Sequence, residues 1–343
     1  MRRFRVIDTG LRAGRRQIAF DQALIEAHKT GRIPDTIRFL RFPPTALVGR
    51  HQALAGSVNA GYCRDRGIGL ARRITGGGAI YFDEGQLGWE LVFHRTSLGT
   101  AALGELARAL CEAAAAGLAR LGVNARYRPR SDLEVDGRKI GGTGGYFDGD
   151  ALFYQGTVVI DPDPGDMIAA LGLPAAAAER MTNLKALLGC APGIAAVQEA
   201  LLAGFAERLG IDPVRGEITA EEEALAARIH DEEIGTDSFV AGIDDPGARA
   251  GVRAGSWRAA GGTITAYVRR DDRLRDVLLA GDFFVTPPRT VLDLEAALRN
   301  VPVREIRPAV DRFFAQAGVG VLSVAPADFA AAIEAAAAAA PGT

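Results

Sequence analysis

The most restrictive pattern in this 343-residue sequence is an apolar stripe that begins at Leu103 and ends at Leu121. Its side chains recur at spacings of three and four residues, which is the period of an α-helix with one buried face. Gly122 follows directly and is a typical residue after a helix end. We therefore expect a helix over residues 100–121, between strands at residues 89–94 and 132–135. The stripe consists of Leu103, Leu106, Ala107, Leu110, Ala114, Leu118 and Leu121.

Other local patterns continue this mixture of helices and strands. Residues 36–49 alternate apolar and charged side chains until Pro43 and Pro44 interrupt the run, which favours extended structure. A further strand is expected at residues 151–160, with a glycine-rich turn between it and the strand at residues 132–135. Helices are expected at residues 166–171, 176–188 and 194–209. This mixture indicates the α+β fold class.

The character of the sequence changes near Gly216. Thr219 is a favourable N-cap, and Glu222 three residues later completes a capping box, so we expect a helix that runs to about residue 230. Antiparallel strands at residues 256–270 and 274–285, followed by helices at residues 291–299, 306–318 and from 326 onward, form a small α+β unit. The sequence therefore predicts two domains, over residues 1–215 and 216–343.

Composition argues against several classes of protein. Hydrophobic residues make up 48% of the chain and charged residues 24%, which is a globular balance. The formal net charge of −2 gives no reason to expect a nucleic-acid partner. Cys63, Cys111 and Cys190 are far apart, so neither a disulfide framework nor a zinc cluster is expected. We find neither a signal peptide nor an apolar run that suits a membrane helix, and expect a cytoplasmic protein.

Two glycine-rich segments carry the candidate chemistry, and the first reads Arg-Arg-Ile-Thr-Gly-Gly-Gly-Ala-Ile-Tyr at residues 72–81. Three successive glycines let a ligand approach the backbone closely, and their amides can point at an anion. Arg72 and Arg73 precede them, and guanidinium groups match carboxylate and phosphate oxygens. The segment suggests a site for an acidic small molecule or a phosphate. A plain glycine turn explains the triplet equally well, because the chain has 42 glycines.

The second segment spans residues 131–145 and holds Lys139 between a candidate strand and a glycine-rich stretch. An ammonium group there can lie where the backbone approaches a ligand. The competing interpretation is that Asp136 and Gly137 form a hairpin turn, with Arg138 and Lys139 as its solvated charges. Spacing alone favours the competing interpretation.

Together, in this order and about 65 residues apart, the two segments resemble the catalytic core of lipoate–protein ligases. That family shares a superfamily with biotin–protein ligases and octanoyltransferases. Residues 72–80 resemble its Arg-Arg-x-Thr/Ser-Gly-Gly-Gly-Ala-Val, and residues 132–143 resemble its Asn-Asp-Leu followed by Gly-(Arg/Lys)-Lys-(Ile/Val)-(Ser/Ala)-Gly-(Thr/Ser). Residues 153–161 resemble a strand written His-His-Gly-Thr-Leu-Leu, and residues 49–52 lie where the family has Gly-x-x-Gln. A weaker likeness to the accessory domain of these ligases lies at residues 234–240, 261–264, 281–284 and 294–298.

The resemblance implies a mixed-sheet catalytic domain, an accessory domain and two half-reactions. ATP activates lipoate as lipoyl-AMP, with octanoate expected as a second substrate, and the acyl group then passes to a lysine of a lipoyl carrier domain. Lys139 is expected to lie beside the triple glycine and to contact the acyl oxygen and the α-phosphate, with Mg²⁺ on the polyphosphate near Asp132. The residues expected to bind ATP or lipoyl-AMP are Arg72, Arg73, Thr75, Gly76, Gly77, Gly78, Ala79, Asp132, Gly142, Thr143, Gly156 and Thr157.

Departures from the family pattern keep other functions open. Ser131 stands where the family has Asn, Phe82 and Gln155 stand where it has His, and Trp89 either reshapes the acyl pocket or packs in the core. The nearest rival is an octanoyl or lipoyl acyltransferase, cysteine-independent or with a cysteine thioester. Relay enzymes of the superfamily hold that cysteine in the loop before the second segment, and residues 124–130 contain none. A non-catalytic lipoyl-binding relative and a biotin–protein ligase are the remaining alternatives.

Overall fold

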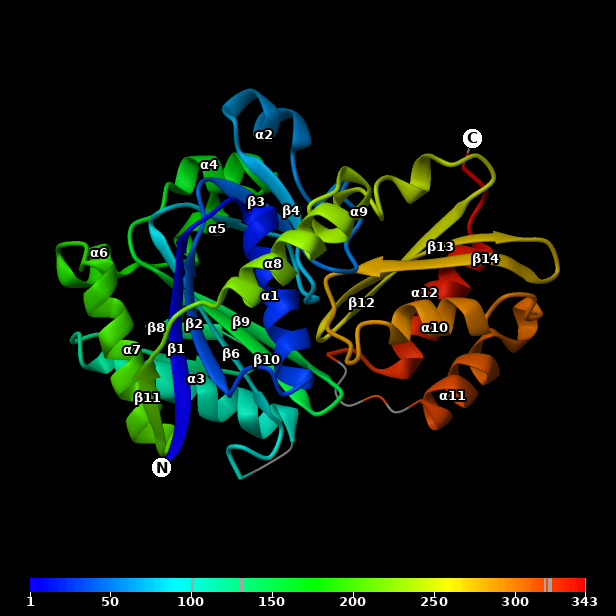
Figure 1. Ribbon diagram of the computed structural model, residues 1–343. Coiled ribbons are helices and arrows are strands. Elements are labelled where there is room, and N and C mark those ends of the chain that lie inside the picture. The colour runs from blue at the N-terminus through cyan, green and yellow to red at the C-terminus, as the bar shows by residue number, and fades with distance from the viewer. Residues whose placement is uncertain (100–101, 130–131, 318, 320–322, 343) are drawn as a thin grey trace. The chain divides into compact units, whose positions relative to one another are not determined.

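The computed structural model describes residues 1–99, 102–129, 132–317, 319 and 323–342 (Figure 1). The chain forms two compact units. The second unit takes in two segments from the N-terminal half of the sequence, and one of them carries the triple glycine. The domain boundary expected after residue 215 stays a prediction, and the two compact units divide after Phe239. The first unit comprises Met1–Leu47, Asn59–Arg72 and Ile80–Phe239, and the second comprises Val48–Val58, Arg73–Ala79 and Val240–Thr343.

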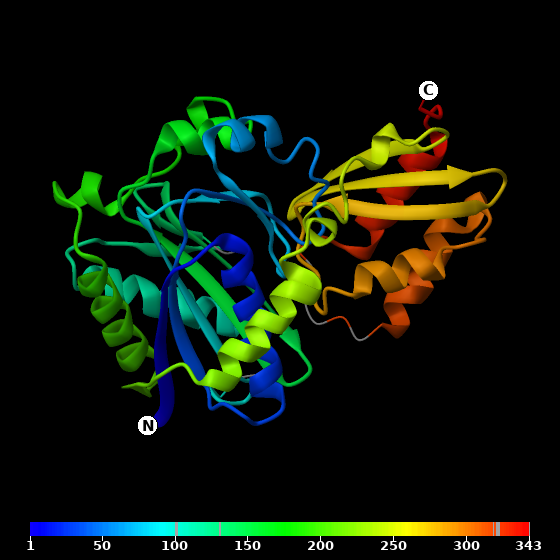
Figure 2. The same ribbon diagram turned by 45° about the horizontal axis from the view of Figure 1, so that its top comes forward.

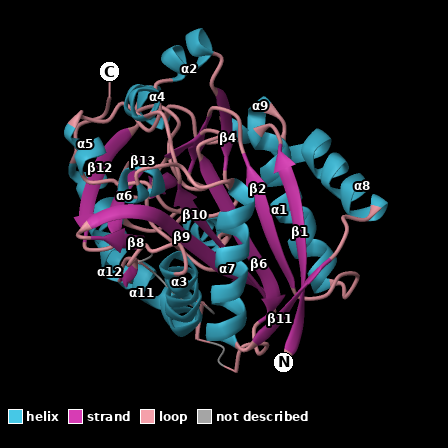
Figure 3. Ribbon diagram, turned by 90° about the vertical axis from the view of Figure 1, so that its left-hand side faces the viewer, coloured by secondary structure: helices cyan, strands magenta, loops and turns pink. Residues whose placement is uncertain are grey.

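Eight strands form the central sheet of the first unit, in the order β11-β1-β2-β6-β10-β9-β8-β7 (Figures 1 and 3). β1 is parallel to both β11 and β2, whereas the neighbours from β2 to β7 are antiparallel. This mixed sheet confirms the predicted fold class. The strands are β1 (Arg2–Leu11), β2 (Thr36–Arg41), β6 (Gln86–His94), β7 (Arg126–Arg128), β8 (Asp132–Val135), β9 (Arg138–Asp148), β10 (Ala151–Val159) and β11 (Ile211–Arg215).

Helices cover both faces of this sheet. α3 (Leu103–Ala119) and α7 (Ile194–Leu209) share one buried apolar cluster with the strands, and the predicted stripe on α3 lies in it. Arg38 of β2 instead points to α1 (Gly14–Lys29), where it pairs with Asp21 at 2.7 Å. Because neighbouring strand residues face opposite sides, and Ile37 and Phe39 belong to the cluster with α3 and α7, α1 covers the other face.

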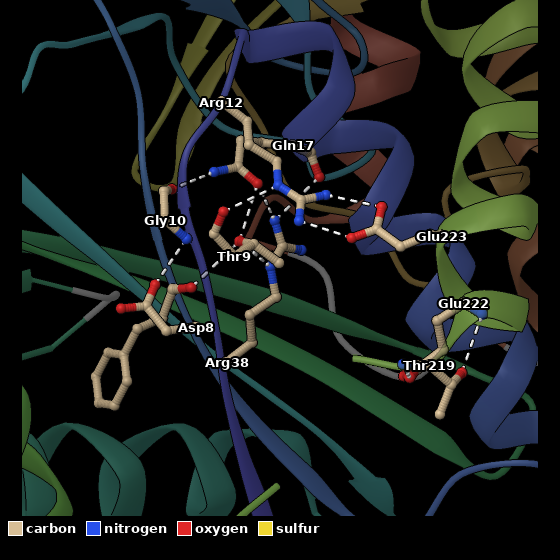
Figure 4. A network of polar contacts seen from close by, with 10 residues as sticks. Asp8, Thr9, Gly10, Arg12, Gln17, Arg38, Thr219, Glu222 and Glu223 are labelled. Atoms are coloured by element: carbon tan, nitrogen blue, oxygen red, sulfur yellow. Dashed lines mark hydrogen bonds and ion pairs between the residues drawn. The ribbon is translucent and has the colours of Figure 1, made fainter. Parts of the chain in front are cut away.

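The helix predicted from Thr219 is α8 (Ala220–Ile229), and its capping box with Glu222 is present. α8 packs on α1 and is tied to the first unit by ion pairs from Arg5 to Glu222 and from Arg12 to Glu223. Figure 4 shows the second pair beside the Thr219 cap. These contacts explain why residues beyond 215 fold with the first unit.

The glycine-rich residues 141–145 form strand, and the predicted turn there is wrong. They lie inside β9, which pairs with β8 on one side and β10 on the other. A side chain at Gly141 would approach the Thr157 carbonyl oxygen to 2.1 Å, and one at Gly145 would approach the Phe153 carbonyl oxygen to 2.3 Å. Glycine is needed here because neighbouring backbones come close. The sequence predicted a turn instead because glycine is also one of the commonest residues of turns.

In the sequence, the triple-glycine segment lies between two strands of a smaller three-stranded sheet, which has the order β4-β3-β5. β4 (Gly69–Arg72) ends directly before Arg73–Ala79, and β5 (Ile80–Phe82) begins directly after it. The extended run predicted over residues 36–49 divides into β2 and β3 (Thr45–Val48), with the two prolines between them. The remaining helices of this part are α2 (Ala60–Arg66), α4 (Pro164–Ala170), α5 (Ala176–Glu179) and α6 (Leu184–Leu188), the last two replacing one expected helix.

The second unit places helices against a three-stranded antiparallel sheet, β12-β13-β14 (Figures 1 and 2). The single strand predicted over residues 256–270 is a hairpin of β12 (Arg253–Ala259) and β13 (Gly262–Arg270), and β14 follows at Leu274–Gly281. Of the described helices, none has both the length and the apolar character that a membrane crossing requires. The helices of the second unit are α10 (Thr290–Ala297), α11 (Ile306–Gln316) and α12 (Pro326–Ala338), with short helical turns at Pro246–Ala248 and Val303–Glu305. The helical turn His230–Ile234 and all but the last residue of α9 (Asp237–Val240) belong to the first unit.

Candidate functional site

Lys139 lies in a group of charged side chains on β8 and β9. The Asp136-Gly137 turn joins the two strands, and both turn residues have positive φ, at 50° and 77°. The Lys139 ammonium lies 2.7 Å from Asp132 Oδ1, and the two side chains are 35% and 24% exposed. The hairpin turn that the sequence suggested is therefore present, but Lys139 is an anchored cation that solvent reaches, and not a free surface charge.

Gly142 makes room for this ammonium. Asp132 and Gly142 are paired across β8 and β9, and a bulge between Leu133 and Glu134 shifts the register of Lys139. A side chain at position 142 would begin 2.9 Å from Lys139 Nζ. The Gly142 amide donates to Thr157 Oγ1 at 3.1 Å, which fixes the strand from the other side. Asp132, Lys139, Gly142 and Thr157, all predicted site residues, thus lie together.

Two arginines of the edge strand β7 extend the charged group. Arg128 pairs with Asp132 Oδ2 and lies 3.4 Å from Glu134 Oε2. Arg126 donates to Glu134 Oε1 at 2.8 Å. Arg128 was not among the predicted site residues. A signal for it was present, because Arg126 and Arg128 alternate along one strand opposite Glu134 and Asp132 on the antiparallel neighbour.

The electrostatics keep Asp132 ionised. Burial raises the pKa of Asp132, but the charges and hydrogen bonds of Lys139 and Arg128 outweigh burial, so its pKa lies below the ordinary value. The hydrogen bond to Asp132 in turn raises the pKa of Arg128. At neutral pH the group therefore presents a carboxylate held between two cations.

Thr143 and Gly156 take part in core packing. Thr143 Oγ1 lies 2.7 Å from the Tyr154 hydroxyl and 3.4 Å from Cys111 Sγ. A side chain at Gly156 would begin 2.1 Å from the Trp89 indole, which is fully buried. Trp89 therefore packs in the core, one of the two outcomes that the sequence left open, and the site roles of Thr143 and Gly156 stay predictions.

The arginines of the first segment are both buried, and they donate mainly to backbone carbonyls, with one further contact from Arg73 Nε to Thr75 Oγ1 at 3.4 Å. Arg72, at the end of β4, donates from Nε to the Phe239 carbonyl oxygen at 3.2 Å. Arg73 donates from Nη2 to the carbonyl oxygens of Gly76 at 3.1 Å and Gly78 at 2.8 Å. Burial lowers the pKa of Arg73 to about 10, so it stays charged at neutral pH. These bonds from Arg73 hold the glycine turn in shape from within.

The C-terminal part of the second unit fills the space that the first two glycines leave. A side chain at Gly76 would begin 2.4 Å from the Phe283 carbonyl oxygen, and one at Gly77 would begin 2.6 Å from the Phe284 ring. The Gly77 amide donates to the Phe283 carbonyl at 3.2 Å, and Gly77 has a φ of 90°. At Gly78, by contrast, the nearest atom lies at 3.8 Å. Two of the three glycines are thus explained by packing within the protein.

The two segments belong to different compact units, so the expected approach of Lys139 to the triple glycine stays a prediction. The same holds for Thr75, whose side chain is buried, and for Ala79. Ser131, where the sequence departs from the family's Asn, lies outside the described residues. Across the described residues, no three His, Cys, Asp or Glu side chains gather as a metal would need, so Asp132 is a single candidate metal ligand.

Two of the three cysteines are poorly placed for thiol chemistry. Cys63 and Cys111 are buried, and burial raises the pKa of both thiols. Cys190 is exposed and follows α6 and its C-cap Gly189. A nucleophilic thiol must be accessible and have a lowered pKa, so neither Cys63 nor Cys111 fits that role as folded.

Comparison with known proteins gives a consistent result. Residues 14–206 match the family described as the lipoyl protein ligase A/B catalytic domain. The chain is similar to the octanoyltransferase LipM of Symbiobacterium thermophilum, with 30% identity over 268 residues that cover 69% of this chain and 97% of that protein.

Two solved structures resemble the chain as well. One comes from a structural analysis of a bipartite lipoate protein ligase and its E2 lipoyl domain from Thermoplasma acidophilum. This match has a TM-score of 0.64 and 26% identity, and it covers 71% of this chain and 98% of that chain. The other is a lipoate-protein ligase A bound with ATP, with a TM-score of 0.65 and 28% identity, and covers 71% of this chain and 100% of that chain. The similar proteins thus include both an octanoyltransferase and ligases.

Proposed function

The chain belongs to the lipoyl protein ligase A/B catalytic domain family, and we propose that it acts as an ATP-dependent lipoate–protein ligase. The proteins that it resembles include an octanoyltransferase and lipoate–protein ligases. In this reaction lipoate or octanoate is activated as acyl-AMP, and the acyl group passes to a lysine of a lipoyl carrier domain. The proposed compartment is the cytoplasm, which suits three free cysteines.

The observation that carries this proposal is the Lys139 ammonium, which pairs with Asp132 over Gly142. Adenylation brings a carboxylate to a phosphate, two anions that repel each other. A cation that is held in place and still reachable can neutralise the charge that develops, and such stabilisation is a large part of phosphoryl-transfer catalysis. The similarity to an ATP-bound ligase supports the same chemistry.

Lys139 has the same proposed role in both half-reactions, which is to neutralise negative charge at the α-phosphate and the acyl oxygen. In the first, a carboxylate oxygen of the acid attacks the α-phosphorus, and pyrophosphate leaves with the electron pair of the broken P–O bond. Lys139 exchanges its contact with Asp132 for one with the α-phosphate and acyl oxygen. In the second, the amine of the carrier lysine attacks the acyl carbon, AMP leaves with the electron pair of the C–O bond, and the amine releases a proton.

Mg²⁺ fits the proposed site through Asp132. Mg²⁺ is usually bound by one or two carboxylates and by substrate phosphates, and it keeps several waters. The carboxylate of Asp132 is ionised and partly exposed, which suits such a ligand once Lys139 has moved to the phosphate. When bound, the metal supplies further positive charge to the polyphosphate.

Carrier-free incubation tests the proposal. Enzyme, ATP, Mg²⁺ and lipoate should give pyrophosphate and enzyme-bound lipoyl-AMP, measured by phosphate-coupled assay and mass spectrometry. The variant Cys63→Ala, Cys111→Ser, Cys190→Ala should retain this activity. Absence of pyrophosphate release with folded enzyme would contradict the proposal.

A transferase that uses no ATP is the second candidate, favoured by the 30% identity to an octanoyltransferase. It would move an octanoyl group from one carrier to another without ATP, and a thiol relay would lose activity in the cysteine-free variant. The buried state of Cys63 and Cys111 and the absence of cysteine from residues 124–130 favour the ligase.

A further inference from the structure

Arg128 of the edge strand β7 has no role in the proposed half-reactions. We infer that Arg128 is a positioning residue that clamps Asp132, so that Asp132 in turn holds Lys139 in the position from which it moves to the α-phosphate. This inference rests on the proposed function for its kinetic consequence, but its structural part concerns only side chains on β7, β8 and β9.

The register between β7 and β8 brings Arg128 to Asp132. Arg128 and Asp132 are direct partners across β7 and β8, so their side chains leave the sheet on the same side. Arg128 pairs with Asp132 Oδ2, and Lys139 pairs with Asp132 Oδ1 at 2.7 Å. Each oxygen of the carboxylate thus has its own cation, and neither cation displaces the other.

A second contact fixes Arg128 itself. Its Nη1 lies 3.4 Å from Glu134 Oε2, two residues along β8 on the same side of the sheet. The planar guanidinium can therefore reach two carboxylates at once, which a lysine ammonium on a flexible stem does less well. The Arg128 side chain is 42% exposed, so solvent reaches it and the desolvation cost of its charge is small.

Charge balance explains why such a clamp matters for the reaction. When Lys139 moves to a phosphate, Asp132 loses one of its two protein cations while a polyanion lies close by. Arg128 still neutralises Asp132 at that point and keeps it from swinging after the lysine. Arg128 therefore acts through Asp132 and needs no contact with the substrate.

Arg126 provides a matched control on the same strand. It is an arginine of β7 that bonds Glu134 at 2.8 Å, but the pairs described for it do not include Asp132. Arg126→Ala removes the same number of atoms and the same charge from the same edge as Arg128→Ala. An effect of lost charge, or of a less stable edge strand, would appear in both variants. An effect of the lost contact with Asp132 would appear only in Arg128→Ala.

The kinetic test is a double-mutant cycle between positions 128 and 132. Single-turnover formation of lipoyl-AMP should slow by about 10-fold in Arg128→Ala, with the KM for lipoate unchanged, and should recover partly in Arg128→Lys. In the Asp132→Asn background, Arg128→Ala should have no further effect. A loss of the same size in that background would mean that Arg128 acts on the substrate directly and would overturn the inference.

A second measurement does not depend on the proposed function. The chain has three lysines, Lys29, Lys139 and Lys185, so labelling by a small amine-reactive ester can be followed for each by peptide mass spectrometry. Lys29 pairs with Asp148 and Lys185 with Asp161, and both serve as internal references. Labelling of Lys139 relative to these two should rise several-fold in Arg128→Ala, roughly to the level of Asp132→Asn, and stay constant in Arg126→Ala.

The two measurements separate the two ideas. If the wild type forms no lipoyl-AMP but Lys139 labelling rises in Arg128→Ala alone, the ligase proposal fails and the clamp stands. If Lys139 labelling is the same in the wild type and Arg128→Ala, the clamp is refuted whatever the activity.

Discussion

The hairpin region of β7, β8 and β9 and the triple-glycine turn use glycine in different ways. In and beside the hairpin region, Gly142 leaves room for the solvent-reachable ammonium of Lys139, Gly156 leaves room for Trp89, and Gly141 and Gly145 let the backbone of β10 come close. In the turn, Gly76 and Gly77 make room for Phe283 and Phe284 of the same unit. The comparison teaches that a glycine run marks a close approach, and that the approaching group can be the protein itself.

The two regions also hold charge differently. The hairpin carries a row of partly exposed ion pairs, whereas Arg73 of the turn is buried and bound to backbone carbonyls. Exposed pairs contribute little to folding, and buried groups that lose a partner cost much more. Changes in the hairpin should therefore alter rates, and changes in the turn should alter stability.

The largest effect is expected at Lys139. Lys139→Ala should slow lipoyl-AMP formation by about 10²-fold or more, because one charge-stabilising donor is lost. Its urea unfolding should stay close to that of the wild type, since the ion pair with Asp132 is partly exposed. Single-turnover kinetics and urea titration measure the two quantities. A near-normal rate in a folded variant would remove Lys139 from the chemistry.

Arg73 comes next and tests the other side of the comparison. Arg73→Ala leaves the carbonyls of Gly76 and Gly78 without this donor, and should lower the free energy of unfolding of the second unit by about 3 kcal/mol. Trp257, which bonds Asp328 within this unit, can report its unfolding by fluorescence in a Trp89→Phe background. A large loss of rate with unchanged unfolding would instead favour the phosphate contact that the sequence suggested for Arg73.

A smaller effect is expected at Gly77. Gly77→Ala should cost about 2 kcal/mol, because it combines a positive φ with a clash against the Phe284 ring. Gly78→Ala is the control, since its position is open, and should cost less than about 0.5 kcal/mol. Adding Phe284→Ala to Gly77→Ala should recover the steric part. Equal costs at positions 77 and 78 would contradict the packing explanation.

The smallest difference is in the pH dependence of the two units. Burial raises the pKa of Glu295 to about 7, more than the Leu279 amide and Arg299 lower it. Its contribution to stability is therefore complete below about pH 4.5 and is lost as pH rises through 7. Unfolding of the second unit, followed by Trp257 fluorescence from pH 5 to 8, should show this loss, and Glu295→Gln should abolish it.

Glu222 of the first unit gives the opposite sign. Burial raises its pKa, but hydrogen bonds from Arg5 and the Thr219 amide outweigh burial and leave the pKa below 4.5. Its contribution is present above pH 4.5 and is lost as pH falls through the lowered value. Glu222→Gln should flatten the acid side of the unfolding profile of the first unit. Parallel pH profiles of the two units would contradict this contrast.

Local patterns predicted much of the fold. The periodic stripe on α3, the bounds of α7 and the capping box of α8 follow from side chains within a few residues of each other, and all are confirmed. β1 and β11 were missed, because β1 interleaves arginines with apolar residues and β11 holds a proline. Their pairing with each other depends on residues more than 200 positions apart, which no local pattern records.

The candidate site was predicted in part for the same reason. The sequence singled out Lys139, Asp132 and Gly142, and the structure brings these three together. It did not find Arg128, whose place depends on the register of a neighbouring strand. Nor did it foresee that Arg73 points to the backbone of its own turn.

The sequence by itself determined which residues carry charge, where glycine removes side chains and which helices have one apolar face, because these properties are local. Only the tertiary structure decided that the glycines at 141–145 belong to a strand, that Phe283 and Phe284 cover Gly76 and Gly77, and that Asp132 is held by two cations. The reason is that packing and ion pairing depend on distances between segments far apart in the chain, and those distances exist only once the strands have paired.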